Sequence, residues 1–133
     1  MHAYTHHVRY HEVDGQGFLF NARYLEIADV AFTEYLRLLG WTYPEFVAAG
    51  ADPSVVSANL TFSAPARFDD SLDVDVACVR VGTSSFELHI AITRAGAAVA
   101  RVESVYVNVD TGTASSRPLP ADVAARLRSS AAR

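Results

Sequence analysis

A long stripe of apolar residues at helical spacing runs through the first third of the chain. The stripe starts just after Asn21 and recurs at Tyr24, Leu25, Ala28, Ala31, Phe32, Tyr35, Leu36 and Leu39. Most of the intervening charged residues fall outside the stripe, and Gly40 follows its last member. This pattern predicts an amphipathic helix that begins at Asn21, buries one face and ends at a glycine.

Beyond residue 53 the pattern changes to alternation of apolar and polar positions, which is typical of half-buried strands. It predicts strands over 54–63, 72–81, 85–94 and 97–110. The connections Gly82-Thr83 and Ala95-Gly96 are short, so the strands that they join must be antiparallel. A weaker alternation favours a first strand over 5–10, and short helices are predicted over 43–49 and from 121 to about 128.

The order of these elements predicts the fold class. A strand and a long helix are followed by antiparallel strands, and the single apolar helix face is matched to one sheet face. The expectation is therefore one α+β domain over residues 1–133, in which a five-stranded antiparallel sheet wraps around one long central helix.

Composition narrows the function. The chain is half hydrophobic, its apolar runs are shorter than the roughly 20 residues that span a bilayer, and its N-terminal segment is polar. We therefore expect a cytoplasmic protein without membrane contact. The net charge of -4 argues against nucleic acid as a partner. All eleven basic residues are arginines, so arginine must hold any phosphate that a ligand carries.

Candidate chemistry lies in the loop before the long helix. Asp14 stands in a glycine-broken segment seven residues before Asn21. Free amides at a helix start favour negative charge, so a carboxylate beside them can support attack on an acyl carbonyl. The same residues fit a structural interpretation, because Asp before Gly15 is common in turns and Asn is a preferred helix cap.

The loop carries a motif in which Asp14-Gly15-Gln16-Gly17 is followed by three apolar residues, Asn21 and then Tyr24. The segment Pro65-Ala66-Arg67-Phe68-Asp69-Asp70 and the later Leu119-Pro120 extend the match over nearly the whole chain. With these features the chain resembles the hotdog-fold acyl-CoA thioesterases, in particular the group that includes 4-hydroxybenzoyl-CoA thioesterase.

The resemblance implies a hotdog fold and hydrolysis of an acyl-CoA thioester to free acid and CoA. It implies that Asp14 is the nucleophile or general base, and that a backbone N–H near Asn21 polarises the carbonyl. No cofactor is implied, since coenzyme A is part of the substrate. It also implies a homodimer or homotetramer whose sheets join edge to edge, with the active sites at the interface. The expected substrate-binding residues are Gly17, Phe20, Tyr24, Asn59 and Arg67, with Arg94 a second cation for coenzyme A.

Other interpretations remain open. The thioester could be carried by an acyl-carrier protein, or the chain could be a non-catalytic module that binds acyl thioesters. Glu26 on the helix is a second candidate acid. A hotdog dehydratase is disfavoured because no histidine follows Asp14 until His89. We expect no metal site, since the histidines near the N-terminus lack a pattern of cysteine or acidic ligands and neighbours in a strand point to opposite faces.

Overall fold

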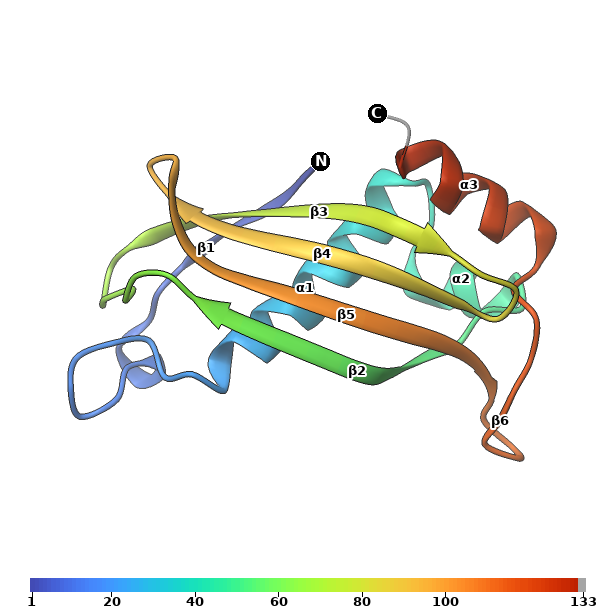
Figure 1. Ribbon diagram of the computed structural model, residues 1–133, viewed down its shortest axis with the longest axis horizontal. Helices are drawn as coiled ribbons and strands as arrows, with labels where there is room; N and C mark the ends of the chain where they lie inside the picture. Colours follow the sequence, from blue (N-terminus) through green and yellow to red (C-terminus); the bar gives the residue numbers. More distant parts are fainter. Residues whose placement is uncertain (132–133) are drawn as a thin grey trace.

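The computed structural model describes residues 1–131 as one curled antiparallel sheet around a central helix (Figure 1). The sheet has the order β1-β3-β4-β5-β2, and the short β6 pairs with β5. The strands are β1 (His2–His7), β2 (Pro53–Phe62), β3 (Ser71–Val81), β4 (Ser85–Arg94), β5 (Ala97–Asp110) and β6 (Ser115–Ser116). The helices are α1 (Arg23–Leu38), α2 (Tyr43–Ala48) and α3 (Ala121–Ala131), with a 3-10 turn, η1, at Tyr10–Glu12. The predicted α+β hotdog architecture is confirmed.

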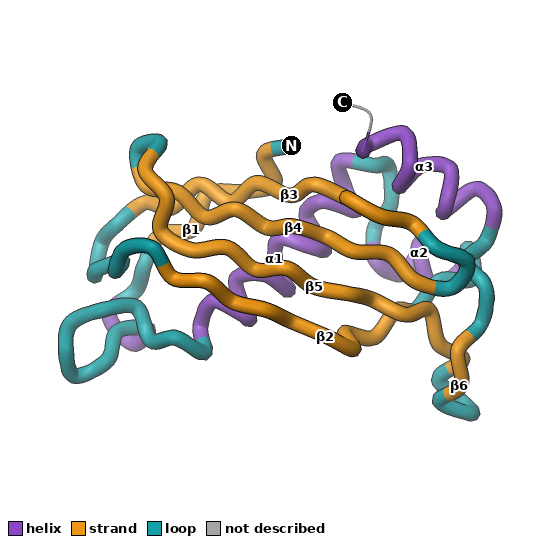
Figure 2. The backbone as a smooth tube through the Cα atoms, viewed as in Figure 1, coloured by secondary structure: helices purple, strands orange, loops and turns teal. Residues whose placement is uncertain are grey.

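The core forms where the inner face of the sheet meets α1 (Figure 2). Alternate residues of β3 and β4 are buried, and their polar neighbours point to the outer face. On α1 the predicted stripe supplies most of the buried residues, which are Tyr24, Ile27, Ala28, Ala31, Phe32, Tyr35 and Leu36. Helices α2 and α3 lie at the end of the sheet where α1 finishes (Figure 1).

The end of α1 follows the prediction from sequence. Gly40 takes a left-handed conformation with φ of 101°, its amide donates to Arg37 and the Trp41 amide donates to Leu36. This pair of hydrogen bonds satisfies carbonyls that the last helical turn leaves free.

The N-terminal elements differ from the prediction. The first strand covers His2–His7 rather than 5–10, because Val8 is buried beyond the strand and the chain then turns into η1. Helix α1 begins at Arg23 with Ala22 as its N-cap, and no side chain caps it. Asn21 is therefore not the cap. The Arg23 amide donates to the Phe20 carbonyl and the Tyr24 amide to the Asn21 carbonyl, so the chain enters the helix through a tight turn.

Strand β2 forms one edge of the sheet and is exposed along most of its length. Its apolar side chains include Val55, Val56 and Phe62, which are 47%, 59% and 51% exposed. An apolar edge strand of this kind is ordinarily covered or paired. Within residues 1–131, no helix is both long and apolar enough to cross a bilayer.

Candidate active site

The loop that carries Asp14 is a small hairpin between η1 and α1. Val13 pairs with Leu19, the Asp14 amide donates to the Phe18 carbonyl at 2.8 Å and the Gly17 amide donates to the Asp14 carbonyl at 2.9 Å. Gly17 closes the turn with φ of 80°, a conformation that costs glycine little. The Leu19 amide donates to Ala66, so the hairpin is attached to the segment after β2.

Hydrogen bonds within the turn orient the Asp14 carboxylate. Its Oδ1 accepts from the Gln16 amide at 2.9 Å and from the Phe18 amide at 3.3 Å. Among residues 1–131, no protein group hydrogen-bonds to Oδ2. The side chain is half-buried, which leaves one anchored oxygen and one available oxygen.

The start of α1 leaves unpaired amides beside this loop. The Phe20 amide donates to Glu12 and the Arg23 amide to Phe20, but in the described part of the chain the amides of Asn21 and Ala22 have no acceptor. Free N–H groups in the first turn of a helix are suited to hold an anion.

A cleft of about 340 Å³ brings these groups together. It is lined by Asp14, Gln16, Phe18, Leu19, Asn21, Tyr24, Phe62, Ser63, Ala64 and Pro65. The acid, the residue at the helix start and the end of β2 therefore face one space, at the end of the molecule where the loop meets β2 (Figure 1).

Aromatic side chains form the apolar wall of the cleft. Tyr24 is 2% exposed, and its ring meets that of Phe62 edge-on at 5.2 Å between centroids. Burial raises the pKa of Tyr24 above its ordinary value, although the Ala66 amide and Arg94 oppose this. Tyr24 is therefore a neutral, packed wall residue at physiological pH.

The two candidate arginines occupy different environments. Arg94 donates to Asp70 at 2.6 Å and to the Pro65 carbonyl at 3.3 Å, so it braces the segment after β2. Burial works to raise the pKa of Asp70, but the Arg67 amide and the Arg94 guanidinium lower it below its ordinary value. The Arg67 guanidinium lies 4.8 Å from the centre of the Phe18 ring and forms no salt bridge within residues 1–131. Arg67 does not line the cleft, but it contacts the lining residue Phe18 and is the more available of the two cations.

A family model for the thioesterase-like superfamily matches residues 8–127 of the chain. The chain belongs to this superfamily. A 1,4-dihydroxy-2-naphthoyl-CoA hydrolase of Nostoc punctiforme is 27% identical over 124 residues, which cover 90% of this chain and 82% of that protein. The resemblance noted from the loop motif, and with it the enzyme class, is confirmed at the level of the family.

Solved structures show the same fold. A thioesterase of Thermus thermophilus, complexed with coenzyme A and zinc, superposes with a TM-score of 0.84 at 24% identity and covers 98% of this chain and 93% of its own. A gentisyl-coenzyme A thioesterase superposes with a TM-score of 0.84 at 22% identity, covering 94% of this chain and 98% of its own.

In this thioesterase-like chain several expected site residues lie outside the cleft. Phe20 is exposed, and Gly17 serves the turn without lining the cavity. Asn59 pairs with Glu103, which places it on the outer face of β2, away from the cleft of its own protomer. Glu26 is exposed and paired with Arg23 at 2.9 Å in a separate hollow.

Glu12 lies outside the cleft of this thioesterase-like chain but connects the elements beside it, which the sequence did not indicate. Its carboxylate accepts from the Arg9 amide at 2.8 Å and contacts the His6 ring at 3.0 Å, and its side chain is only 12% exposed. Burial works to raise the pKa of Glu12, but the hydrogen bonds from the Arg9 amide and His6 outweigh it and lower that pKa. The Glu12 carbonyl also accepts from the Phe20 amide, so this residue links β1 to the start of α1. In the sequence, Glu12 stands out only as a carboxylate three residues after Arg9. Such a spacing is common in surface turns, so it does not predict this link.

Proposed function

We propose that this protein hydrolyses an acyl-CoA thioester to a free acid and coenzyme A. The observation that carries the proposal is the shared cleft: Asp14 and Asn21, which lies two residues before α1, line one cavity, and the amides of Asn21 and Ala22 have no acceptor within residues 1–131. A thioester carbonyl bound in this space would lie near both the carboxylate and these hydrogen-bond donors.

Asp14 can act by either of two routes. As general base, its free oxygen takes a proton from water while the water oxygen bonds to the thioester carbon. As nucleophile, the same oxygen bonds to that carbon and forms a mixed anhydride, which water then hydrolyses. In both routes the carbonyl oxygen becomes an oxyanion near the Asn21 and Ala22 amides, and its collapse expels the thiolate of coenzyme A. One such donor is typically worth about 3–4 kcal/mol of barrier.

The lining of the cleft favours substrates with an aromatic acyl group, which are therefore the first class to test. Phe18, Tyr24 and Phe62 give it aromatic walls, and edge or offset contacts between rings are favourable. The relative from Nostoc punctiforme and the gentisyl-coenzyme A thioesterase are both named for aromatic acyl groups. Arg67 is the cation that we assign to the phosphates of coenzyme A.

We propose that two chains pair through β2. This strand has an unpaired edge, and the apolar hollow beside it is lined by Leu25 of α1 together with Val55 and Ala58. Since Phe62 of the same strand lines the cleft, a partner on this edge would also border the active site. The outward-facing Asn59 would belong to this interface region. The mass in solution distinguishes such a dimer from a homotetramer built of two dimers.

Release of thiol from a panel of aromatic and aliphatic acyl-CoAs tests the proposal in wild type and Asp14→Asn. Asparagine keeps an acceptor for the Gln16 and Phe18 amides, so the hairpin is retained. We expect at least a 10²-fold loss of kcat.

Asp110→Asn is the matched control, because Asp110 accepts from the Gly112 amide in a similar turn at 2.9 Å and lies outside the cleft. Near wild-type activity of Asp14→Asn would reject the mechanism. Tight acyl-CoA binding without turnover in the wild type would indicate a binding module instead.

A further inference from the structure

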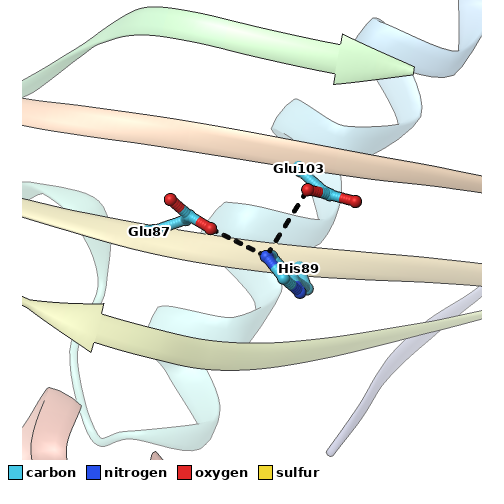
Figure 3. Close-up of side chains that lie close together, drawn as sticks. All are labelled: Glu87, His89 and Glu103. Carbon is cyan, nitrogen blue, oxygen red and sulfur yellow. Dashed lines mark hydrogen bonds and ion pairs between the residues drawn. The ribbon is translucent and has the colours of Figure 1, made fainter. Parts of the chain in front are cut away.

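The outer face of the sheet carries a group of metal-ligating side chains that the thioesterase site does not use. Glu87 and His89 lie two residues apart on β4, so they share a face, and Glu103 of β5 is paired directly with His89 (Figure 3). Their inner-face neighbours on the same strands are buried against α1, so these three side chains point away from the core and the cleft. We refer to them as the Glu87–His89–Glu103 cluster.

The distances in this cluster fit a tetrahedral metal ion. His89 Nε2 lies 2.8 Å from Glu87 Oε2 and 3.8 Å from Glu103 Oε2. All the potential ligand atoms lie within 4.8 Å of one another. Ligands about 2.0–2.1 Å from a tetrahedral zinc ion are separated by about 3.3 Å. The observed distances bracket this separation, so small side-chain adjustments suffice.

We propose that the Glu87–His89–Glu103 cluster binds a divalent transition-metal ion such as Zn²⁺. The ligands are one imidazole nitrogen and two carboxylate oxygens, a set that suits zinc, cobalt and nickel and leaves one position for water. Magnesium and calcium favour sites built from oxygen alone, so they are weaker competitors. The side chains are only 23%, 27% and 37% exposed for His89, Glu87 and Glu103, and neighbouring strands hold their backbones in register.

Arg101 is the internal competitor for this site. Its guanidinium donates to His89 Nδ1 and lies 3.4 Å from Glu103 Oε1. Arginine only donates hydrogen bonds, so in this arrangement Nε2 of the imidazole carries the proton and faces Glu87. A metal at Nε2 needs the opposite tautomer, with the proton on Nδ1, and Arg101 must then swing away. The side chain is 52% exposed, which leaves it room to do so.

This competition gives the proposal a distinctive test. Removal of Arg101 takes away a positive charge and a donor that opposes the metal-binding tautomer. Arg101→Gln also supplies a carbonyl oxygen that can accept from Nδ1–H, as partners of metal-bound histidines commonly do. Substitution of this residue is therefore expected to strengthen metal binding, whereas substitution of a ligand weakens it.

The experiment is calorimetric titration of the whole protein with Zn²⁺ in a non-chelating buffer, followed by Co²⁺ absorption spectra for coordination number. We expect one equivalent per chain. Binding should weaken by at least about tenfold in Glu103→Gln and His89→Asn and strengthen several-fold in Arg101→Gln. Asp75→Asn is the matched control: Asp75 of β3 contacts His2 of β1 at 3.2 Å, and within residues 1–131 this pair has no third metal-ligating side chain beside it. The zinc affinity of this variant should equal that of the wild type.

Absence of Zn²⁺ binding at millimolar concentration would overturn the proposal. So would binding that survives His89→Asn, or an Arg101→Gln variant that binds more weakly than the wild type. Because the readout is metal affinity, the result does not depend on whether the cleft hydrolyses acyl-CoA.

Discussion

The link made by Glu12 between β1 and the start of α1 gives a stability prediction that can be worked from the contacts. Its carboxylate accepts from the Arg9 amide and contacts His6, and both side chains of the His6–Glu12 pair are largely buried. Glu12→Gln keeps an acceptor for the amide but loses the charge. Hydrogen bonds to charged groups contribute about 1.5–3 kcal/mol. Since the glutamine still accepts from the Arg9 amide, we expect the free energy of unfolding to fall by only about 1–2 kcal/mol at pH 7.

The effect should depend on pH in a defined direction. The pKa of Glu12 is lowered from its ordinary value of 4.5. A carboxylate with a lowered folded-state pKa contributes stability above its unfolded-state pKa and loses that contribution as the pH falls through the folded-state value. The difference between wild type and Glu12→Gln should therefore be full at pH 7 and shrink below 4.5.

Urea unfolding at pH 7 and at about pH 3.5 measures this difference. Asp69→Asn is the matched control, because Asp69 pairs with His7 at 2.9 Å while both side chains are more than half exposed. An exposed pair contributes little, so that variant should stay within about 0.5 kcal/mol of wild type. Equal destabilisation of the two variants, or a Glu12→Gln effect that is unchanged at low pH, would show that the buried charge of Glu12 does not stabilise the fold.

Two further variants test the proposed substrate contacts and assembly. Arg67→Gln should raise KM for acyl-CoA by roughly two- to fivefold at unchanged kcat, as expected for an exposed charge pair. The KM of substrates that end at pantetheine, which lack the nucleotide phosphates, should not change. Arg128→Gln, on the distant α3, is the control and should behave as wild type. Val56→Lys places a charge on the apolar edge of β2 and should convert the expected dimer to a monomer in sedimentation experiments at micromolar concentration. A wild-type monomer, or a variant of unchanged mass, would argue against pairing through this edge.

Much of the fold could be predicted from the sequence. Where a helix or strand buries only one face, apolar residues recur along it at a regular spacing that reveals the element. The α1 stripe and the alternation of β4 and β5 were predicted with close boundaries for this reason. The first strand was misplaced because its alternation is weak and Val8 is buried outside it. The two-residue β6 carries no period at all.

At the candidate site, the sequence could predict positions only where residue type and a short local turn determine where a side chain lies. Asp14 and Asn21 were expected to share a space, and they line one cleft. The exact helix start was missed because the tight turn, rather than an Asn cap, sets it. The Glu87–His89–Glu103 cluster was missed because it depends on the register between β4 and β5, which a single strand pattern does not contain.

A structure with a nonhydrolysable acyl-CoA analogue would show directly whether Asp14 and the free amides before α1 meet the same thioester carbonyl. We expect the carbonyl oxygen about 2.7–3.1 Å from an amide nitrogen of Asn21 or Ala22. We also expect a carboxylate oxygen of Asp14 about 3–3.5 Å from the carbonyl carbon, or one water away. An acyl carbonyl bound instead beside Glu26, or with Asp14 turned away from it, would show that Asp14 and these amides are not the catalytic groups.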